Sequence, residues 1–477
     1  MSREYETVIG LEVHVELATK TKIFCGCSTA FGGAPNTHTC PVCTGMPGSL
    51  PVLNKQVVEY AMAVGLATNC TINQNCKFDR KNYFYPDNPQ NYQISQLYEP
   101  ICRNGGIEIE TADGTKKTVG IHEIHMEEDA GKLVHDDWDD VSIVDFNRSG
   151  VPLIEIVSEP DMRSADEVIA YLEKLRLIIQ YLGASDCKLN EGSMRADVNL
   201  SVREVGASEF GTRTEMKNLN SFRAIARAIE GEKNRQIDLI ESGEKVVQET
   251  RRWDDAKESS HAMRSKEDAQ DYRYFPEPDL VPIHISDEWL AEVKNRQPEL
   301  RTEKLERYES EYEIPRYDAE IITSSKHLAD IFEQTVAICG KPKKVSNWLM
   351  VETMRLLKER EMEPEDIVFS PEHLAALVEL ADAGTINSTV AKEVFEHMFE
   401  DDTDPKQYVE EHGLKTVNDE GALRATIEQV IKDNPQSVDD YHNGKEKAIG
   451  FLVGQTMKAM KGKANPGMVN QILKELL

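Results

Sequence analysis

The stretch Gly10-Leu11-Glu12-Val13-His14-Val15-Glu16-Leu17 alternates strictly between apolar and ionisable side chains. Successive side chains of a β-strand point to opposite faces of the sheet, so this period of two predicts a half-buried strand. Glu12 and His14 share its polar face, roughly 7 Å apart. They are suited to flank one metal ion if a third ligand comes from elsewhere. A solvated outer face explains the same pattern.

The same alternation returns near the middle of the chain. Apolar and polar side chains alternate from Met194 to Arg203, and again from Thr212 to Lys217 after a loop that contains glycine. The two runs predict an antiparallel hairpin with one ionisable face, on which Asp197 and Glu215 lie. Together with the first strand, they indicate an open sheet that carries acids and bases where water or a ligand must lie.

An acidic cluster stands in His125-Met126-Glu127-Glu128-Asp129-Ala130-Gly131-Lys132. Hard cations such as Mg²⁺ take oxygen ligands, usually one or two carboxylates together with substrate phosphates. A site for metal-bound ATP is one interpretation of the cluster, and a solvated charged turn is the other. The sequence does not show which of Glu127, Glu128 and Asp129 touch the metal, because a shift of register by one residue exchanges the two faces.

Four cysteines have the spacing of a metal site. Cys25-Gly26-Cys27 is followed, twelve residues on, by Cys40-Pro41-Val42-Cys43. Two such pairs predict a four-thiolate zinc knuckle, whose closed ligand shell leaves no open position for catalysis. The role of Cys25, Cys27, Cys40 and Cys43 is therefore predicted to be structural. The other five cysteines lack this spacing and are predicted to be buried thiols.

Two loops combine basic and aromatic residues with turn-forming prolines. They run from Asp79 to Pro89 and from Tyr272 to Asp279. Such residues suit a phosphate and a stacked base, while an ordinary packed loop is the alternative.

Further segments have recognisable structural patterns. The apolar run Val151–Val157 predicts a covered strand. A capping box at Ser164–Glu167 opens a helix that Gly183 ends, and Ser221 begins another helix that runs to about Gly243. From about residue 290 the pattern is helical, as in the runs Glu288–Asn295, Lys326–Cys339, Trp348–Glu361 and Pro371–Asp382.

Composition excludes several classes of protein. The 477 residues are enough for about three domains, and the net charge of −29 argues against a broadly basic nucleic-acid surface. No apolar run reaches the length of a membrane span, and residues 1–5 lack a signal-peptide core, so we expect a cytoplasmic protein that contacts no membrane. Phosphate-binding loops of the G-x-x-x-x-G-K type and the G-x-S-x-G motif are absent, which disfavours simple kinases and hydrolases.

The charge reverses near the C-terminus. Residues 400–440 carry twelve acidic side chains against four basic ones, whereas residues 441–477 carry six lysines against two glutamates. RNA binding needs local cations because phosphate contacts dominate affinity. Residues 458–467, which end a predicted helix and open a loop, therefore form a candidate RNA contact, although lysines also favour helix C-termini for dipole reasons.

Several of these stretches, in this order, resemble the B subunit of the tRNA-dependent amidotransferase. The resemblance extends to the segment Gly450–Gln455 and so covers effectively the whole chain. The stretches that carry it are Val8–Leu17, Phe78–Pro89, His125–Lys132, Pro152–Asp161, Lys217–Phe222 and Tyr272–Asp279.

The resemblance implies an α+β fold. It consists of a largely antiparallel, cradle-shaped sheet domain, similar in plan to glutamine synthetase and guanidino kinases, over residues 1–292. An all-α helical domain over residues 293–405 and a small helical tail domain over residues 406–477, contacting tRNA, follow it.

The resemblance also implies a ligase that works as a heterotrimer with an amidase-type A subunit and a small C subunit. With ATP it would phosphorylate the side-chain carboxylate of Glu-tRNA(Gln) or Asp-tRNA(Asn), and ammonia from the amidase would complete the amide. The chain lacks the glycine- and serine-rich run of an amidase, which agrees with this division of labour.

Carried over to this sequence, the magnesium–ATP site falls on Glu12, His14 and the acids Glu127, Glu128 and Asp129. Lys81, Asp197, Glu215 and Lys217 are the catalytic candidates around it, and Lys81 and Lys217 are the candidates to bind ATP. Zinc at the four cysteines is structural, since not every family member has them. Two rival interpretations are a stand-alone ATP-dependent amide synthetase and a non-enzymatic zinc-containing RNA-binding protein.

Overall fold

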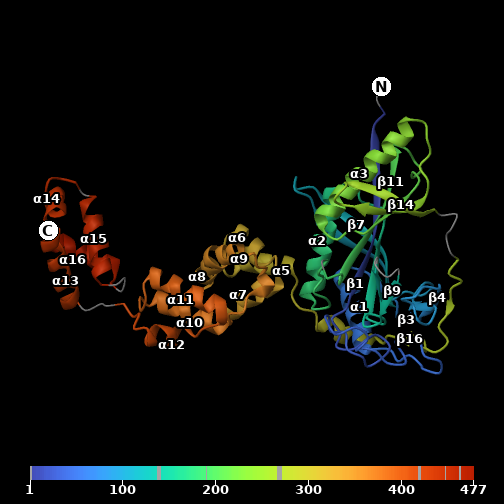
Figure 1. The fold of residues 1–477 in the computed structure, drawn as a ribbon, viewed down its shortest axis with the longest axis horizontal. Helices are drawn as coiled ribbons and strands as arrows, with labels where there is room; N and C mark the ends of the chain where they lie inside the picture. Colours follow the sequence, from blue (N-terminus) through green and yellow to red (C-terminus); the bar gives the residue numbers. More distant parts are fainter. Residues whose placement is uncertain are drawn as a thin grey trace. The chain divides into compact units, whose positions relative to one another are not determined.

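The computed structural model describes residues 3–136, 141–189, 191–265, 271–416, 420–445, 447–460 and 464–477. Its largest feature is a sheet of nine strands in the order β14-β13-β12-β11-β1-β10-β7-β6-β2 (Figure 1). Neighbouring strands run antiparallel except β12 and β13, which are parallel. The strands are β1 (Tyr5–Glu16), β2 (Thr71–Ile72), β6 (Cys102–Glu110), β7 (Lys116–Glu128), β10 (Pro152–Ser158), β11 (Met194–Glu204), β12 (Thr214–Lys217), β13 (Glu249–Asp254) and β14 (Ser259–Ser265).

Strand β1 lies in the middle of this sheet, between β11 and β10. Its apolar side chains at Leu11, Val13 and Val15 are buried, whereas Glu12 and His14 on the opposite face are only partly so. The predicted strand and its two faces are confirmed. The predicted hairpin is also confirmed, because β11 and β12 pair antiparallel.

Three helices cover the apolar face of the sheet. Helix α1 (Lys55–Ala67) contacts β6 and β7, α2 (Ala165–Tyr181) contacts β6, and α3 (Phe222–Glu241) contacts β11. The hydroxyl of Ser164 accepts a hydrogen bond from the backbone N–H of Glu167 at the start of α2. The hydroxyl of Ser221 accepts one from the backbone N–H of Ala224 at the start of α3, as the capping patterns predict. All three helices share one hydrophobic core with the sheet, so the polar face stays free of helices α1–α3.

Smaller sheets flank the large one. They are β15 (Phe275–Pro276), β4 (Asp79–Asn82) and β5 (Tyr92–Ser95) in one sheet, β16 (Ile283–His284) with β3 (Asn75–Cys76), and β8 (Lys132–Asp136) with β9 (Val141–Asp145). The first of these brings the two aromatic loops together, because Phe275 pairs with Arg80 and the rings of Tyr83 and Tyr272 lie 6.2 Å apart.

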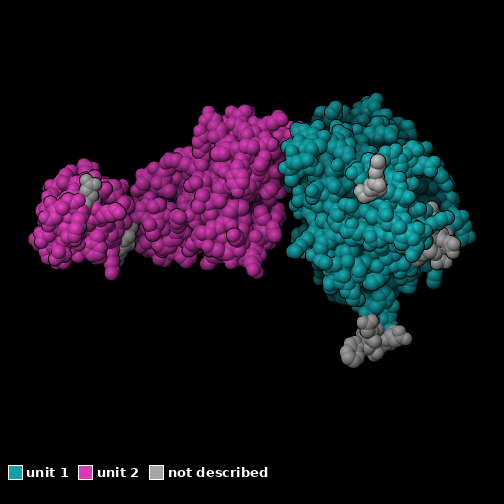
Figure 2. Space-filling model, turned by 90° about the horizontal axis from the view of Figure 1, so that it is seen from above, with its two compact units in different colours: residues 1–300 teal, residues 301–477 magenta. Residues whose placement is uncertain are grey.

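The chain divides into two compact units, Met1–Leu300 and Arg301–Leu477 (Figure 2). Helix α4 (Asp287–Asn295) ends the first unit, and the second unit is helical. Its helices are α5 (Arg301–Ser310), α6 (Arg316–Ile322), α7 (Lys326–Cys339), α8 (Pro342–Asn347), the π-helix η2 (Trp348–Thr353), α9 (Met354–Arg360), the 3₁₀-helix η3 (Pro364–Asp366), α10 (Pro371–Asp382), α11 (Ser388–Asp401), α12 (Pro405–Glu411), α13 (Glu420–Asp433), α14 (Pro435–His442), α15 (Ala448–Ala459) and α16 (Pro466–Leu476).

The second unit contains two separate hydrophobic cores. One is built from residues between Leu305 and Val409, the other from residues between Leu423 and Leu473. A mixed α/β architecture with an antiparallel-dominated sheet and a helical C-terminal region is thus confirmed. The division into three domains, over residues 1–292, 293–405 and 406–477, stays a prediction. Among the described residues, no helix combines the length and hydropathy of a membrane span.

Candidate functional site

Two groups of ligand-type side chains lie on the polar face of the nine-stranded sheet. The first, here called the His14 cluster, consists of His14, Glu127 and Glu155, whose ligand atoms all lie within 4.8 Å of one another. Strand β10 runs between β1 and β7 and places Glu155 directly opposite His14. Two carboxylates with an imidazole form a plausible ligand set for a divalent cation.

The His14 cluster is largely withdrawn from solvent. The Nδ1 atom of His14 lies 3.2 Å from Glu127 Oε1, and the Nε2 atom of His125 lies 3.0 Å from Glu155 Oε2. Burial disfavours the charged carboxylates, but contacts with His125 and His14 outweigh it and hold the pKa of Glu127 well below its usual range. His125 likewise helps to lower the pKa of Glu155 against the effect of burial. The neighbouring imidazoles thus favour the ionised form of both acids.

The second group, here called the Glu12 cluster, lies next to the first. Glu12, Asp197 and Glu215 again bring their oxygens within 4.8 Å of one another, from strands β1, β11 and β12. The register explains this, since Glu12 pairs with Asp197. Because Glu12 and His14 stand two positions apart on β1, the clusters are neighbours at roughly one strand repeat, about 7 Å. Burial and the nearby Glu155 raise the pKa of Glu12.

Lys217 provides the positive charge of the Glu12 cluster. Its Nζ atom lies 2.5 Å from Asp197 Oδ2 and 2.8 Å from Glu215 Oε1. Although burial opposes its charge, Asp197 and Glu215 raise the pKa of Lys217, so the ammonium is retained. Such a cation can move between carboxylates and a phosphate oxygen.

Lys81 on β4 belongs to the surroundings of the His14 cluster. Its ammonium lies 4.9 Å from the ring centroid of Tyr272, in the second aromatic loop. Burial disfavours its charge, yet Glu127 and Glu155 raise the pKa of Lys81. The pairing of β4 with β15 therefore puts one aromatic loop and one lysine beside the acidic face.

The structure separates the three consecutive acids of the predicted magnesium site. Glu127 joins the His14 cluster, whereas Glu128 points to the other face of β7 and accepts hydrogen bonds from Gln90 Nε2 at 2.6 Å and from the backbone N–H of Ile94 at 3.0 Å. Burial raises the pKa of Glu128 to about 8. Asp129 is paired with Arg195 at 2.8 Å. Neither Glu128 nor Asp129 is brought into the two clusters.

The sequence did not identify Glu155 as a candidate ligand. It lies in the almost wholly apolar run 151–157, which predicted only a covered strand. The useful signal was the single carboxylate inside that run, since an acid in a covered strand must find a cation or a hydrogen-bond donor.

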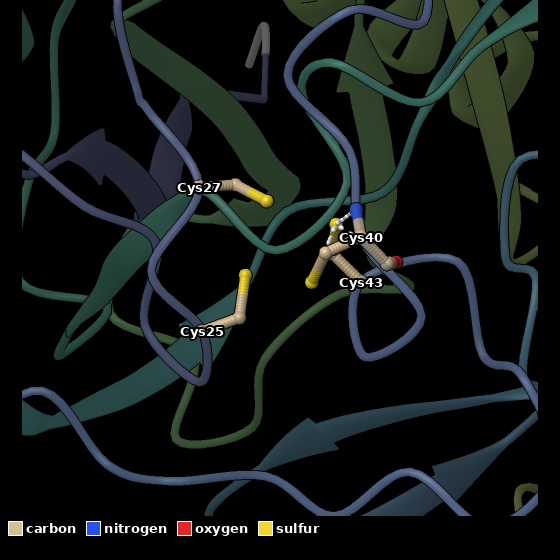
Figure 3. A group of neighbouring side chains, drawn as sticks. All are labelled: Cys25, Cys27, Cys40 and Cys43. Atoms are coloured by element: carbon tan, nitrogen blue, oxygen red, sulfur yellow. Dashed lines mark hydrogen bonds between the residues drawn. The ribbon is translucent and has the colours of Figure 1, made fainter.

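The four predicted zinc cysteines converge in space. The Sγ atoms of Cys25, Cys27, Cys40 and Cys43 lie within 4.8 Å of one another and point toward a common centre (Figure 3). The Sγ atoms of Cys40 and Cys43 are 3.9 Å apart, close to the edge of about 3.8 Å expected for a tetrahedral zinc–sulfur site. Hydrogen bonding with Cys25 lowers the pKa of Cys43 to about 4, with help from Lys22. The cluster therefore fits zinc.

Zinc analysis of purified protein is expected to find about one ion per chain. Substitution Cys40→Ser should lower the thermal midpoint by roughly 5 °C or more, because a structural zinc contributes folding free energy. Cys339→Ser is the matched control, since Cys339 lies in α7 outside the cluster. Metal-free protein with four reactive thiols and an unchanged midpoint would refute the zinc site.

Comparison with known proteins gives consistent matches over the whole chain. The family described as "GatB/GatE catalytic domain" matches residues 7–291, and the family described as "GatB domain" matches residues 330–477. A relative in Agathobacter rectalis is 80% identical over 475 residues, and one in Lachnospira eligens is 74% identical over 481 residues, each covering 100% of both chains. A relative in Caldicellulosiruptor saccharolyticus is 60% identical over 99% of both chains.

All three relatives are named as the B subunit of an aspartyl/glutamyl-tRNA(Asn/Gln) amidotransferase. The alignments with the Agathobacter rectalis and Lachnospira eligens relatives cover 100% of this chain. Together with the matching catalytic-domain family, it shows that this chain belongs to the B-subunit family of the aspartyl/glutamyl-tRNA(Asn/Gln) amidotransferases.

Proposed function

We propose that this chain uses ATP to activate the side-chain carboxylate of Glu-tRNA(Gln) or Asp-tRNA(Asn), which ammonia from a partner subunit then converts to the amide. The observation that carries the proposal is the pair of neighbouring carboxylate clusters on the sheet face opposite helices α1–α3, each with a lysine close by. Two cation sites about one strand repeat apart suit the phosphate chain of a nucleotide.

The chemistry explains the need for such a site. A carboxylate does not react with ammonia at neutral pH, because oxide would have to leave. Attack of a carboxylate oxygen on the γ-phosphorus of ATP forms an acyl phosphate and releases ADP. Ammonia then forms the C–N bond, the C–O bond to phosphate breaks, and the nitrogen loses a proton. Phosphoryl transfer of this kind depends mainly on positioning and on neutralisation of charge.

The residues take distinct roles in this scheme. His14, Glu127 and Glu155 would hold one magnesium ion, and Glu12, Asp197 and Glu215 a second. Bound magnesium would neutralise phosphate charge and align the γ-phosphate with the carboxylate. Lys217, now between Asp197 and Glu215, is placed to turn toward a phosphate oxygen, and Lys81 is placed to neutralise charge on the other side.

We further propose that the sheet unit is a cradle of the glutamine synthetase and guanidino kinase type, followed by a helical domain and a tail domain. The partners would be an amidase-type A subunit, a small C subunit and misacylated tRNA. The relatives are each named as one lettered subunit of an amidotransferase, which supports a multi-subunit enzyme.

Free ammonium at high concentration is expected to replace the partner amidase at least in part. This chain, given ATP, Mg²⁺, misacylated tRNA and ammonium chloride, should form the amide and ADP together, because activation needs only its own site. Thin-layer separation of the amino acids released from the tRNA measures the product.

Two comparisons complete this experiment. Glutamine in place of ammonium should give no product with this chain alone, and a glutamine-dependent product would contradict the division of labour. Free glutamate in place of the charged tRNA should also give no product. An active reaction there would favour a stand-alone amide synthetase.

A further inference from the structure

Two neutral side chains contact the carboxylates of the Glu12 cluster. The amide Nδ2 atom of Asn199 donates a hydrogen bond to Glu12 Oε1 at 2.9 Å. The hydroxyl of Thr250 donates one to Glu215 Oε2 at 2.7 Å. Neither residue belongs to the cluster itself, and neither has a role in the chemistry proposed above. They hold the acids on the two outer strands of the cluster, on either side of Asp197.

The strand register explains both contacts. On β11, Asn199 stands directly opposite Glu215 of β12. It also lies two residues from Asp197, which pairs with Glu12 of β1. Asn199 is therefore diagonal to Glu12 on the same face of the sheet, within reach of its carboxylate. Thr250 stands opposite Glu215 on the other side, in the parallel pair of β12 and β13. The pairing of the strands thus places one polar side chain beside each acid.

The covered face of β13 fixes the place of Thr250. Its neighbour Arg251 is 9% exposed, and the Nε atom of Arg251 lies 3.6 Å from Glu232 Oε2 of α3. Trp253 is 2% exposed and lies so close to Gly231 of the same helix that a Cβ there would be 3.0 Å from the ring. Because a strand alternates its faces, these two contacts with α3 hold Thr250 on the polar face.

Neutral donors suit carboxylates that must bind a cation. A hydrogen bond to one oxygen fixes the plane of a carboxylate and so directs its other lone pairs. Lys217 also contacts this cluster, but its positive charge repels an incoming metal ion, so the ammonium must move aside. An amide and a hydroxyl carry no net charge and can keep their hydrogen bonds while an ion is bound. They therefore suit the task of orienting metal ligands.

We propose that Asn199 and Thr250 are positioning residues, which orient Glu12 and Glu215 for the cation that binds the nucleotide phosphates. The inference rests on the proposed function, because that function requires the cation. Groups that orient metal ligands in this way account for about 10- to 100-fold in metal affinity. A purely structural role is the alternative, and it would lower stability while leaving the affinity for metal unchanged.

The test measures the binding of Mn²⁺ to the full-length chain by electron paramagnetic resonance of the free ion. Thr250→Val keeps the shape of the side chain but removes the hydroxyl, so it should weaken binding at the Glu12 cluster by about tenfold. Thr250→Ser restores a hydroxyl and should bind as the unaltered chain does. Glu215→Gln removes a ligand and thereby identifies which bound ion belongs to this cluster.

Two further variants complete the set. Asn199→Leu removes the other neutral donor and should weaken the same ion comparably. Thr118→Val is the matched control, because Thr118 is exposed on β7, far along the strand from Glu127. It should bind Mn²⁺ normally, and thermal melting should show every variant folded. In the assembled enzyme, the Mg²⁺ concentration for half-maximal amidation should rise about tenfold in Thr250→Val, and saturating Mg²⁺ should restore the rate.

Unchanged Mn²⁺ affinity in both Thr250→Val and Asn199→Leu would overturn the inference, and so would equal losses in Thr250→Val and Thr250→Ser. A lower melting temperature with unchanged affinity would assign the two residues a structural role and also overturn it. If Glu215→Gln alone loses an ion, only the positioning role is refuted. If Glu215→Gln binds every ion normally, the Glu12 cluster holds no cation, and this part of the proposed function is refuted together with the inference.

Discussion

Substitution of His14 by alanine is expected to lower ATP-dependent amidation by about 100-fold or more, because one proposed ligand of a phosphate-neutralising metal is lost. The imidazole is also the group that lies 3.2 Å from Glu127 and 3.9 Å from Glu155. When the imidazole is removed, the carboxylates of Glu127 and Glu155 lose a shared partner and repel each other more strongly. Release of ADP and formation of amide, measured on the assembled enzyme with misacylated tRNA, should fall together.

Two further variants sharpen this test. Glu155→Gln should reduce the rate comparably, since it removes a cation ligand while keeping the shape of the side chain. His122→Ala is the matched control, because His122 lies on β7 with a 60% exposed side chain. The glutaminase reaction of the partner should persist in all three. If His14→Ala amidates at a nearly normal rate, the activation site has been misplaced.

Removal of residues 417–477 is expected to weaken tRNA binding strongly and to flatten its dependence on salt. The segment holds the lysine-rich end of the chain, and each lysine–phosphate pair that the truncation removes should lower the salt slope by about one unit. Lys447, Lys458 and Lys474 are exposed, whereas Lys461 and Lys463 lie outside the described residues. Filter binding at several salt concentrations measures both effects, and ATP binding to the first unit should not change.

The structure decides where this truncation should begin. A cut at residue 406 would remove Val409, which is 1% exposed and packs in the first core of the helical unit. A cut after Thr416 spares that core and removes the separate one between Leu423 and Leu473. The matched point variants are Lys458→Ala in α15, within the removed segment, and Lys392→Ala in α11, within the retained segment, as the control. Unchanged tRNA affinity in the truncated assembly would place the RNA-binding surface elsewhere.

Local patterns predicted the elements that carry the site. The alternation around Glu12 and His14 gave the correct strand and the correct faces, because a strand with one buried face must separate apolar from polar residues. The capping serines at 164 and 221 marked helix starts for an equally local reason, since their hydroxyls satisfy backbone donors of the first turn. The cysteine pairs marked a cluster, because a zinc site needs particular ligand spacings.

The grouping of ligands could not be read from the sequence. Strand β10 is inserted between β1 and β7 although it follows both in the chain. That insertion brings Glu155 to His14 and makes it a better ligand candidate than Glu128 or Asp129. Strand order depends on packing between distant segments, on which local alternation carries no information. The pairing of the loops at Arg80 and Phe275 was hidden for the same reason.

The central place of strand β1 also matters while the protein is being made. Its partners in the sheet, β10 and β11, begin at Pro152 and Met194. At elongation rates of about 5–20 residues per second, the ribosome needs about 10–40 s after β1 to complete both partners. Until β10 is complete, the strand has neither of its native neighbours, and both of its edges are open to wrong pairing. The N-terminal strand that places a side chain in each of the two clusters is therefore also exposed to wrong pairing on the nascent chain.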